Sequence, residues 1–146
     1  MMSVAQVEAL RELNSVAQSG DADAVESAVF NAFDAGFSPD FVPALLTLIP
    51  RRDHTRHEDI VSALQELRDP RAVEALYDAA LVDHEYLAYD EFFGLARKCT
   101  WALADIGTPE AHSRLQALAK HNNSQIAAYA RKRLKNWDDE RDRKGG

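Results

Sequence analysis

One short pattern occurs three times in the chain, and it limits the possible folds more than any other feature. In each copy an alanine is followed seven residues later by a proline, and that proline six residues later by a leucine. The copies are AFDAGFSPDFVPAL at 32–45, which is the loosest, ALQELRDPRAVEAL at 63–76 and ALADIGTPEAHSRL at 102–115. A repeat of this kind predicts a row of similar units that stack on one another.

The proline of each copy predicts the start of a helix. Proline lacks a backbone N–H and therefore fits the first helical position, where that N–H would have no partner. Ser38, Asp69 and Thr108 stand directly before the three prolines, where a side-chain oxygen can cap the next helix. Apolar residues recur at helical spacing along nearly the whole chain. We therefore expect an all-α fold, an α-solenoid in which stacked helical hairpins cover one another's apolar faces.

The helical units also resemble a known repeat. Residues 94–107 (GLARKCTWALADIG), with 60–70 and 109–118, resemble HEAT-like repeats of the short bacterial kind, which include the repeats of phycobilin lyases. The resemblance covers about residues 22–137 and implies that the hairpins are HEAT-like. Residues 126–134 match the first helix of a unit, and we expect them to cap the C-terminal end.

Length and charge narrow the class of protein further. The 146 residues suit one domain, a HEAT-like repeat domain at 1–137, followed by a charged, flexible C-terminal tail at 138–146. The 17 Lys and Arg residues against 24 Asp and Glu residues give a net charge of −7. This balance argues against a nucleic-acid partner and favours a basic protein partner. We expect the protein to be a monomer when free.

Cysteine usage and hydropathy predict the compartment. A single cysteine, Cys99, excludes an internal disulfide and fits a reducing environment. The first 20 residues lack the continuous apolar core of a secretion signal. No apolar run approaches the roughly 18 residues of a membrane span. We therefore expect a cytoplasmic location and no membrane partner.

The repeat is interrupted once, by a segment that we call the insert (residues 83–93). Successive repeat prolines are 31 and then 39 residues apart, so eight residues are extra before the third unit. Insertions in stacked arrays form loops on one face, often the binding face. The insert is rich in carboxylates and aromatics, and no Lys or Arg lies between Ala79 and Ala96. We predict that a partner binds at Asp83, Glu85, Tyr86, Tyr89, Asp90 and Glu91.

The aromatic residues of this region have an alternative role in packing. The tyrosines, and above all Phe92 and Phe93, could pack on their own hairpin. Trp101 stands at a repeat position that is polar in the other units, where Asn31, Ser62 and Lys132 occur. Either the insert folds over Trp101, which is the favoured expectation, or Trp101 is itself a contact residue.

The loop at 51–59 contains two histidines with the spacing of metal ligands. His54 and His57 are three residues apart, but three nearby arginines would oppose a cation. We interpret this segment as a solvated loop and expect no metal site. In the insert, His84 lies beside two carboxylates. In the alternative hypothesis that the protein is an enzyme, His84 is the candidate acid/base group.

The chain lacks the sequence signatures of common active sites. No dinucleotide-binding, phosphate-loop, zinc-protease or serine-hydrolase motif occurs. Cys99 falls on a core-facing stripe, where cysteines are inert. Basic residues cluster late, and we interpret them as the solvated face of the capping helix; they are Lys120, Arg131, Lys132, Arg133 and Lys135. We expect no catalysis and no cofactor.

A second resemblance suggests a function. Residues 91–108 resemble a segment of small bacterial HEAT-repeat proteins encoded beside polymorphic toxins, and the resemblance implies an immunity protein. Such a protein is a non-catalytic module that binds and neutralises a cognate toxin domain, here a basic one because the chain is acidic. The rivals are a HEAT-repeat adaptor or assembly subunit with a phycobilin-lyase-like scaffold, an enzyme that uses His84, and a nucleic-acid-binding HEAT protein, which the charge disfavours.

Overall fold

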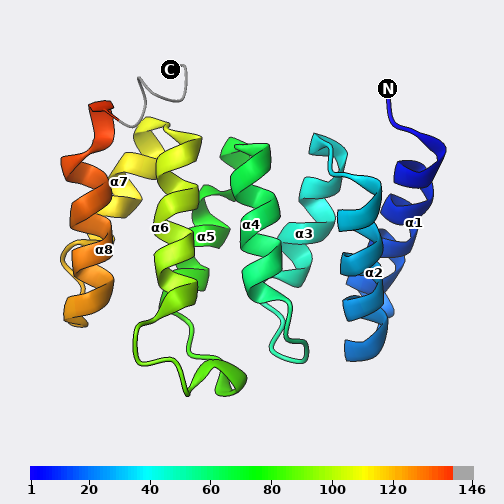
Figure 1. The fold of residues 1–146 in the computed structure, drawn as a ribbon, viewed down its shortest axis with the longest axis horizontal. Helices are drawn as coiled ribbons and strands as arrows, with labels where there is room; N and C mark the ends of the chain where they lie inside the picture. The colour runs from blue at the N-terminus through cyan, green and yellow to red at the C-terminus, as the bar shows by residue number, and fades with distance from the viewer. Residues whose placement is uncertain (140–146) are drawn as a thin grey trace.

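The computed structural model describes residues 1–139, and positions 140–146 of the predicted tail lie outside the described residues. Within residues 1–139 the chain forms α-helices, short 3-10 turns and loops, without a strand. In Figure 1, α2, α4, α6 and α8 lie nearer the viewer and α3, α5 and α7 behind them. The α-helices are α1 (Val4–Ser19), α2 (Ala22–Ala35), α3 (Val42–Leu48), α4 (His57–Leu67), α5 (Val73–Leu81), α6 (Gly94–Ile106), α7 (Pro109–Leu118) and α8 (Ser124–Lys135). The predicted all-α solenoid of stacked hairpins is confirmed.

The repeat prolines begin a helical segment in every copy. Pro109 is the first residue of α7. Pro39 and Pro70 instead begin three-residue 3-10 turns, η1 (Pro39–Phe41) and η2 (Pro70–Ala72), which lead directly into α3 and α5. The second helix of the first two hairpins therefore starts with a tighter turn than that of the third.

Two of the three predicted caps form. The side chains of Asp69 and Thr108 accept hydrogen bonds from backbone N–H groups two and three residues further on, at 2.9 and 3.1 Å. Ser38 makes no such bond, because its hydroxyl lies against the Asp40 carboxylate, 3.5 Å away. On the other side of these turns, Gly36 and Gly107 end α2 and α6 with φ angles of 93° and 71°, which glycine adopts without strain.

The residues of the repeat build the core between the two layers. The alanine and the final leucine are fully buried in all three copies, and Leu64 and Leu103 beside the alanines are buried as well. The equivalent residue in the loose first copy, Phe33, is 42% exposed. One cluster of buried residues runs from Ala9 in α1 to Ala130 in α8.

The first and last helices close the two ends of the row. α1 begins with a capping box between Ser3 and Gln6 and packs on α2 and α3. α8 packs on α6 and α7, so the predicted C-terminal capping helix is present. Among residues 1–139, no helix combines the length and the apolar character that a membrane crossing requires.

Candidate functional site

Loops from three successive hairpins meet at one edge of the solenoid. They are residues 49–56 between α3 and α4, the insert between α5 and α6, and residues 119–123 between α7 and α8. The insert contains a 3-10 turn, η3 (Glu85–Leu87), and projects beyond the helical layers beside the 49–56 loop (Figure 1). The break in the repeat therefore places extra chain at an edge rather than on the face of the helices.

Three histidines form a stack, which we call the histidine stack: His54 from the 49–56 loop, His57 at the start of α4 and His84 from the insert. The ring centroids of His54 and His57 are 4.2 Å apart, and those of His57 and His84 are 3.7 Å apart. All three side chains are buried. The interpretation of His54 and His57 as part of a solvated loop is therefore wrong, because the insert packs His84 against them and excludes water.

Hydrogen bonds determine where the protons of this stack lie. The Nε2 atoms of His54 and His57 contact the carbonyl oxygens of Leu48 and Arg51, at 2.8 and 2.6 Å. A carbonyl only accepts, so both Nε2 atoms carry hydrogen, and each neutral ring is left with Nδ1 as its acceptor. Nδ1 of His54 accepts from the Arg56 backbone N–H at 3.0 Å, and Nδ1 of His57 accepts from the Tyr86 hydroxyl at 2.7 Å. The four ring nitrogens of His54 and His57 are therefore all used in structural bonds.

These bonds bear on the chemistry that the stack can perform. A metal ligand or general base needs a nitrogen lone pair that is not already engaged. The bonds made by His54 and His57 leave neither ring with one. Across residues 1–139 there is also no group of three or more His, Cys, Asp or Glu side chains suited to a metal ion. The arrangement acts as a structural clasp between the insert and the 49–56 loop.

Burial disfavours the charged forms of His57 and His84. It lowers the pKa of His57 to about 4 and also lowers the pKa of His84, with Arg52 contributing. Burial raises the pKa of Tyr86 to about 12, so the hydroxyl retains the proton that it donates to His57. Protonation of the stack would place charge in a dry site, which costs free energy. We therefore expect the attachment of the insert to weaken at acid pH.

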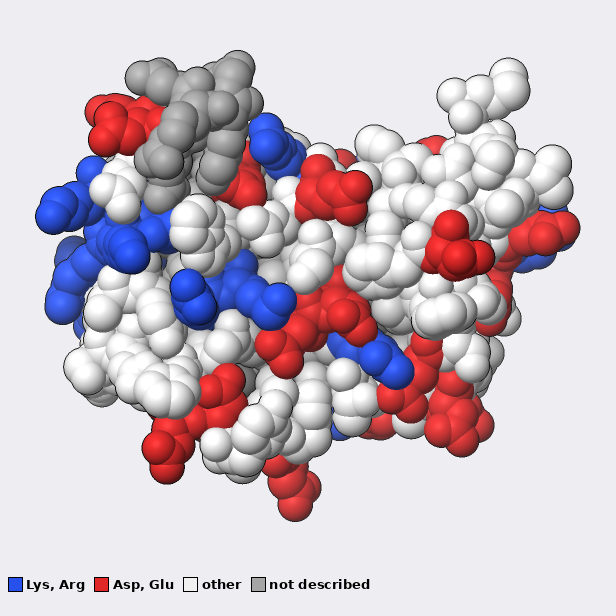
Figure 2. Space-filling view, in the orientation of Figure 1, with Lys and Arg blue, Asp and Glu red and all other residues white. Residues whose placement is uncertain are grey.

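A groove of about 990 Å³ opens beside the clasp, and we call it the acidic groove. The insert carboxylates Asp83, Glu85, Asp90 and Glu91 all line it. Its apolar lining comes mainly from Leu81, Leu87, Phe93 and Ile126. Arg52 is the sole Lys or Arg among the described residues that line it, and its guanidinium donates to the Asp83 carbonyl at 2.6 Å. Figure 2 shows acidic side chains along this lower edge of the molecule.

The predicted site residues separate into different roles. Asp83, Glu85 and Glu91 are exposed. The carboxylate of Asp90 accepts from the backbone N–H groups of Phe92 and Gly94, at 2.9 and 2.8 Å. Asp90 thus holds the junction where α6 begins as well as facing the groove.

The two tyrosines do not line the groove with the carboxylates. Tyr86 is half-buried, and its hydroxyl bonds to His57. Tyr89 is 80% exposed and is not among the residues that line the groove. The structure therefore gathers the four predicted carboxylates but directs the tyrosines elsewhere.

Trp101 is covered from a different direction than expected. The Arg133 guanidinium of α8 lies 3.4 Å from the centre of the Trp101 ring. Because α8 packs on α6, it provides the cover that we expected from the insert. From the insert, Phe92 lines a hollow beside this pair.

The comparisons with known proteins agree with this architecture. Residues 95–121, which comprise most of α6 and all of α7, match the PBS lyase HEAT-like repeat family. A search of curated proteins and a search of solved structures each found no match to the chain. The helical hairpins define an α-solenoid, and residues 95–121 within it are similar to a HEAT-like repeat.

The histidine stack is the part of the site that sequence reasoning missed. One usable signal was present, since His57 precedes Val61 and Leu64 by four and seven residues and so lies on the buried stripe of α4. No spacing rule connects His57 to His84, because the two are 27 residues apart and on different hairpins. Their contact depends on how the insert folds back.

Proposed function

We propose that the protein is a non-catalytic protein-binding module whose acidic groove receives a basic segment of a partner. The observation that carries this proposal is the convergence of Asp83, Glu85, Asp90 and Glu91 on one groove of about 990 Å³. Lysine and arginine side chains suit such a lining because their apolar stems can cover Leu81 and Leu87 while their charged ends reach the carboxylates.

The way in which the insert is attached also supports a binding role, and two of the three histidines of the stack are engaged in that attachment. His54 and His57 use both ring nitrogens in structural bonds. The clasp holds the insert in place before a partner arrives, which reduces the entropy lost on binding. Carboxylates on an exposed rim attract a basic partner over a distance and raise its association rate.

Within this class, the proposed role is that of an immunity protein that binds and neutralises a basic bacterial toxin domain. The support is the resemblance of residues 91–108, which span the end of the insert and the whole of α6. A toxin inhibitor needs fast, tight association, and complementary charge supplies the speed.

A phycobilin-lyase-like adaptor is the second candidate, because residues 95–121 match the PBS lyase HEAT-like repeat. The two candidates make different predictions for the cell. An adaptor of that kind associates with a pigment-attachment complex, whereas an immunity protein rescues growth when it is co-expressed with the toxin domain encoded by the adjacent coding sequence. Growth rescue that requires the insert carboxylates favours immunity.

The groove itself is tested with a synthetic peptide of alternating lysine and leucine as the probe, by fluorescence polarisation. We expect the combined Asp83→Lys, Glu85→Lys and Glu91→Lys variant to weaken binding by at least about tenfold and to remove most of its salt dependence. Asp90 is left unchanged because its carboxylate holds the start of α6.

A matched control carries the same change in net charge at three other exposed carboxylates, Glu8→Lys, Asp34→Lys and Glu66→Lys. It should bind the peptide nearly as the parent protein does. Equal losses in the two variants would mean that overall charge, and not the groove, governs binding. Parent-like binding by the insert variant would place the basic partner elsewhere.

A further inference from the structure

A second groove lies between α6 and α8, and its charge is opposite to that of the acidic groove. We call it the cationic groove; its volume is about 460 Å³. It is lined by Phe92, Arg97, Thr100, Trp101, Ala128, Tyr129, Lys132 and Arg133. None of these lining residues, all within the described part of the chain, is an Asp or Glu. The two grooves meet at the end of the insert, where Glu91 and Phe93 line one and Phe92 lines the other.

The walls of the cationic groove come from matching positions on two packed helices. Arg97, Thr100 and Trp101 follow one another at i, i+3 and i+4 on α6, which puts them on one face. Tyr129, Lys132 and Arg133 have the same spacing on α8. Two helix faces of the same pattern therefore oppose each other across the hollow.

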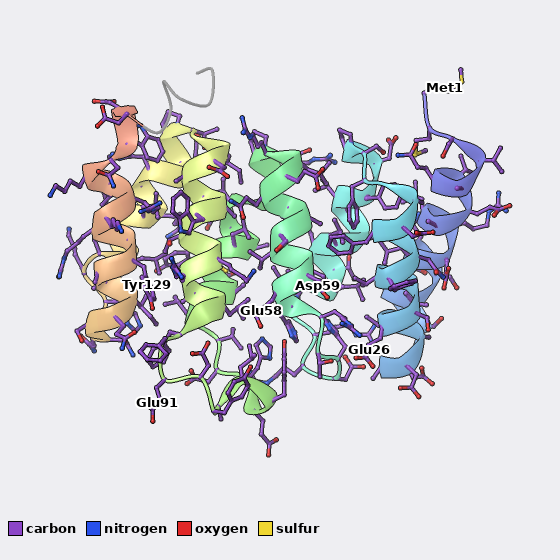
Figure 3. All side chains as sticks on the ribbon, viewed as in Figure 1. Met1, Glu26, Glu58, Asp59, Glu91 and Tyr129 are labelled. Carbon is purple, nitrogen blue, oxygen red and sulfur yellow. The ribbon has the colours of Figure 1, made fainter. Side chains whose placement is uncertain are left out.

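Contacts within the groove hold its shape. The Arg133 guanidinium lies 3.4 Å from the centre of the Trp101 ring, and Arg133 is buried. The Tyr129 hydroxyl donates to the Phe92 carbonyl and so ties α8 to the end of the insert. Figure 3 marks Tyr129 on α8 and Glu91 on the insert beside it. The groove is formed before any ligand binds.

Further basic residues surround the cationic groove and add to its attraction for anions. Lys98, Arg131 and Lys135 are exposed on the same two helices. In Figure 2, Lys and Arg gather over α6 and α8, while acidic side chains cover α4 next to them. This reversal is local, because Asp and Glu outnumber Lys and Arg by 24 to 17 in the chain. A surface of one sign raises the local concentration of ligands of the other sign.

The size of the patch and the aromatic lining select among anionic ligands. A nucleic-acid strand that extended past α6 toward α4 would meet Glu58 and Asp59, which repel phosphates (Figure 3). A short peptide can place carboxylates beside Arg97 and Lys132 and put an apolar side chain on Phe92, which is 68% exposed. Arginine also pairs with carboxylates in a two-bond geometry.

We propose that the cationic groove binds a short acidic peptide segment with aromatic side chains, presented by a protein partner. This site is separate from the acidic groove and does not depend on the function proposed for it. The protein then binds two partner segments of opposite charge: a basic segment at the acidic groove and an acidic segment at the cationic groove.

The test uses a fluorescent peptide of alternating glutamate and phenylalanine as the probe. We expect the parent protein to bind it and the Arg97→Glu, Lys132→Glu variant to bind at least about tenfold more weakly. Arg133 is left unchanged because it packs on Trp101. The control variant, Arg11→Glu with Lys120→Glu, makes the same charge change at exposed residues outside the groove and should bind within about twofold of the parent.

Trp101 reports whether the peptide occupies the groove. In a Trp137→Phe background, bound peptide should change the emission of Trp101, which is only half-buried. Circular dichroism first establishes that each variant is folded. No binding to the parent, equal binding by the reversed variant, or binding without a Trp101 response would each overturn the proposal. If an oligothymidylate with the same net charge bound more tightly than the peptide, the groove would be a nucleic-acid site and the peptide proposal would be wrong.

Discussion

The acidic and cationic grooves border the same helix, α6, yet they arise in different ways. The acidic groove depends on the insert, a segment that departs from the repeat. The cationic groove is built largely from regular positions of the repeat: Trp101 on α6 and Lys132 on α8 are equivalent residues of successive units. A solenoid can therefore acquire binding surfaces both by interrupting its repeat and by changing side chains within it.

The two grooves also differ in what holds them together. Two helices that pack on the core form most of the cationic groove. The acidic groove depends on a loop attached by the histidine stack, by Arg52 and by Asp90. Changes in α6 should therefore affect both grooves, whereas changes in the attachments should affect mainly the acidic one, because the insert supplies only Phe92 to the lining of the cationic groove.

Truncation of the shared helix should have the largest effect. Leu103 is fully buried in α6, so Leu103→Ala should lower the free energy of unfolding by about 2–5 kcal/mol and weaken binding at both grooves. Urea unfolding and the two peptide probes measure this. Val4→Ala, at a residue that is 76% exposed, is the control and should change little. Loss of binding at one groove only would mean that α6 does not couple them.

Acidification should weaken the clasp next. His57 has its pKa lowered to about 4 from 6.5, so between these values the unfolded chain holds a proton that the folded stack excludes. This contribution to stability is complete above pH 6.5 and falls by about 3 kcal/mol as the pH drops to about 4. Urea unfolding at several pH values measures it, and peptide binding to the acidic groove should decline over the same range.

The variant His57→Gln isolates this effect, because glutamine can donate and accept hydrogen bonds but does not titrate in this range. We expect a shallower dependence of stability on pH, with the remaining slope carried partly by His84, whose pKa is also lowered. Asn122→Gln, at an exposed residue without a titratable group, is the control and should keep the parent slope. An unchanged slope in His57→Gln would exclude the clasp as the source.

Removal of the Asp90 carboxylate should have a smaller effect, which falls more on the acidic groove than on the cationic groove. Asp90→Ala leaves the N–H groups of Phe92 and Gly94 without their acceptor, at a cost of about 1 kcal/mol. Binding of the lysine–leucine peptide should weaken more than binding of the glutamate–phenylalanine peptide, because Asp90 lines the acidic groove and reaches the cationic groove only through its bond to Phe92. Asp83→Ala removes an exposed carboxylate of the same groove and is the control for charge alone. Equal loss of both peptides would show that the insert supports both grooves.

The smallest effect concerns Trp101 fluorescence, measured with Trp137→Phe in the background. Since Arg133 covers the ring, Arg133→Ala should shift the emission to longer wavelength and increase quenching by acrylamide. Deletion of residues 84–91 should change these values less, because the insert reaches this region only through Phe92. If the deletion exposed Trp101 as fully as Arg133→Ala does, the insert would have to shield the ring as well.

Local sequence predicted most of the scaffold. The hairpins, the caps at Asp69 and Thr108 and the final helix α8 all follow from residues within a few positions of one another. Ser38 is the exception, because the competing Asp40 carboxylate engages its hydroxyl. The insert was located by counting between prolines, and four of its predicted binding residues line one groove, whereas their role in binding stays a prediction.

The remaining features depend on residues that lie far apart in the chain. The sequence by itself determined the helices, their order and the position of the insert, because helical periodicity and capping act over a few residues. The tertiary structure decided that His84 stacks on His57, that Tyr86 serves the clasp, and that Arg133 covers Trp101. Each of these pairs spans 27 to 32 residues. Contacts over such separations form only after the hairpins have packed, so no local pattern encodes them.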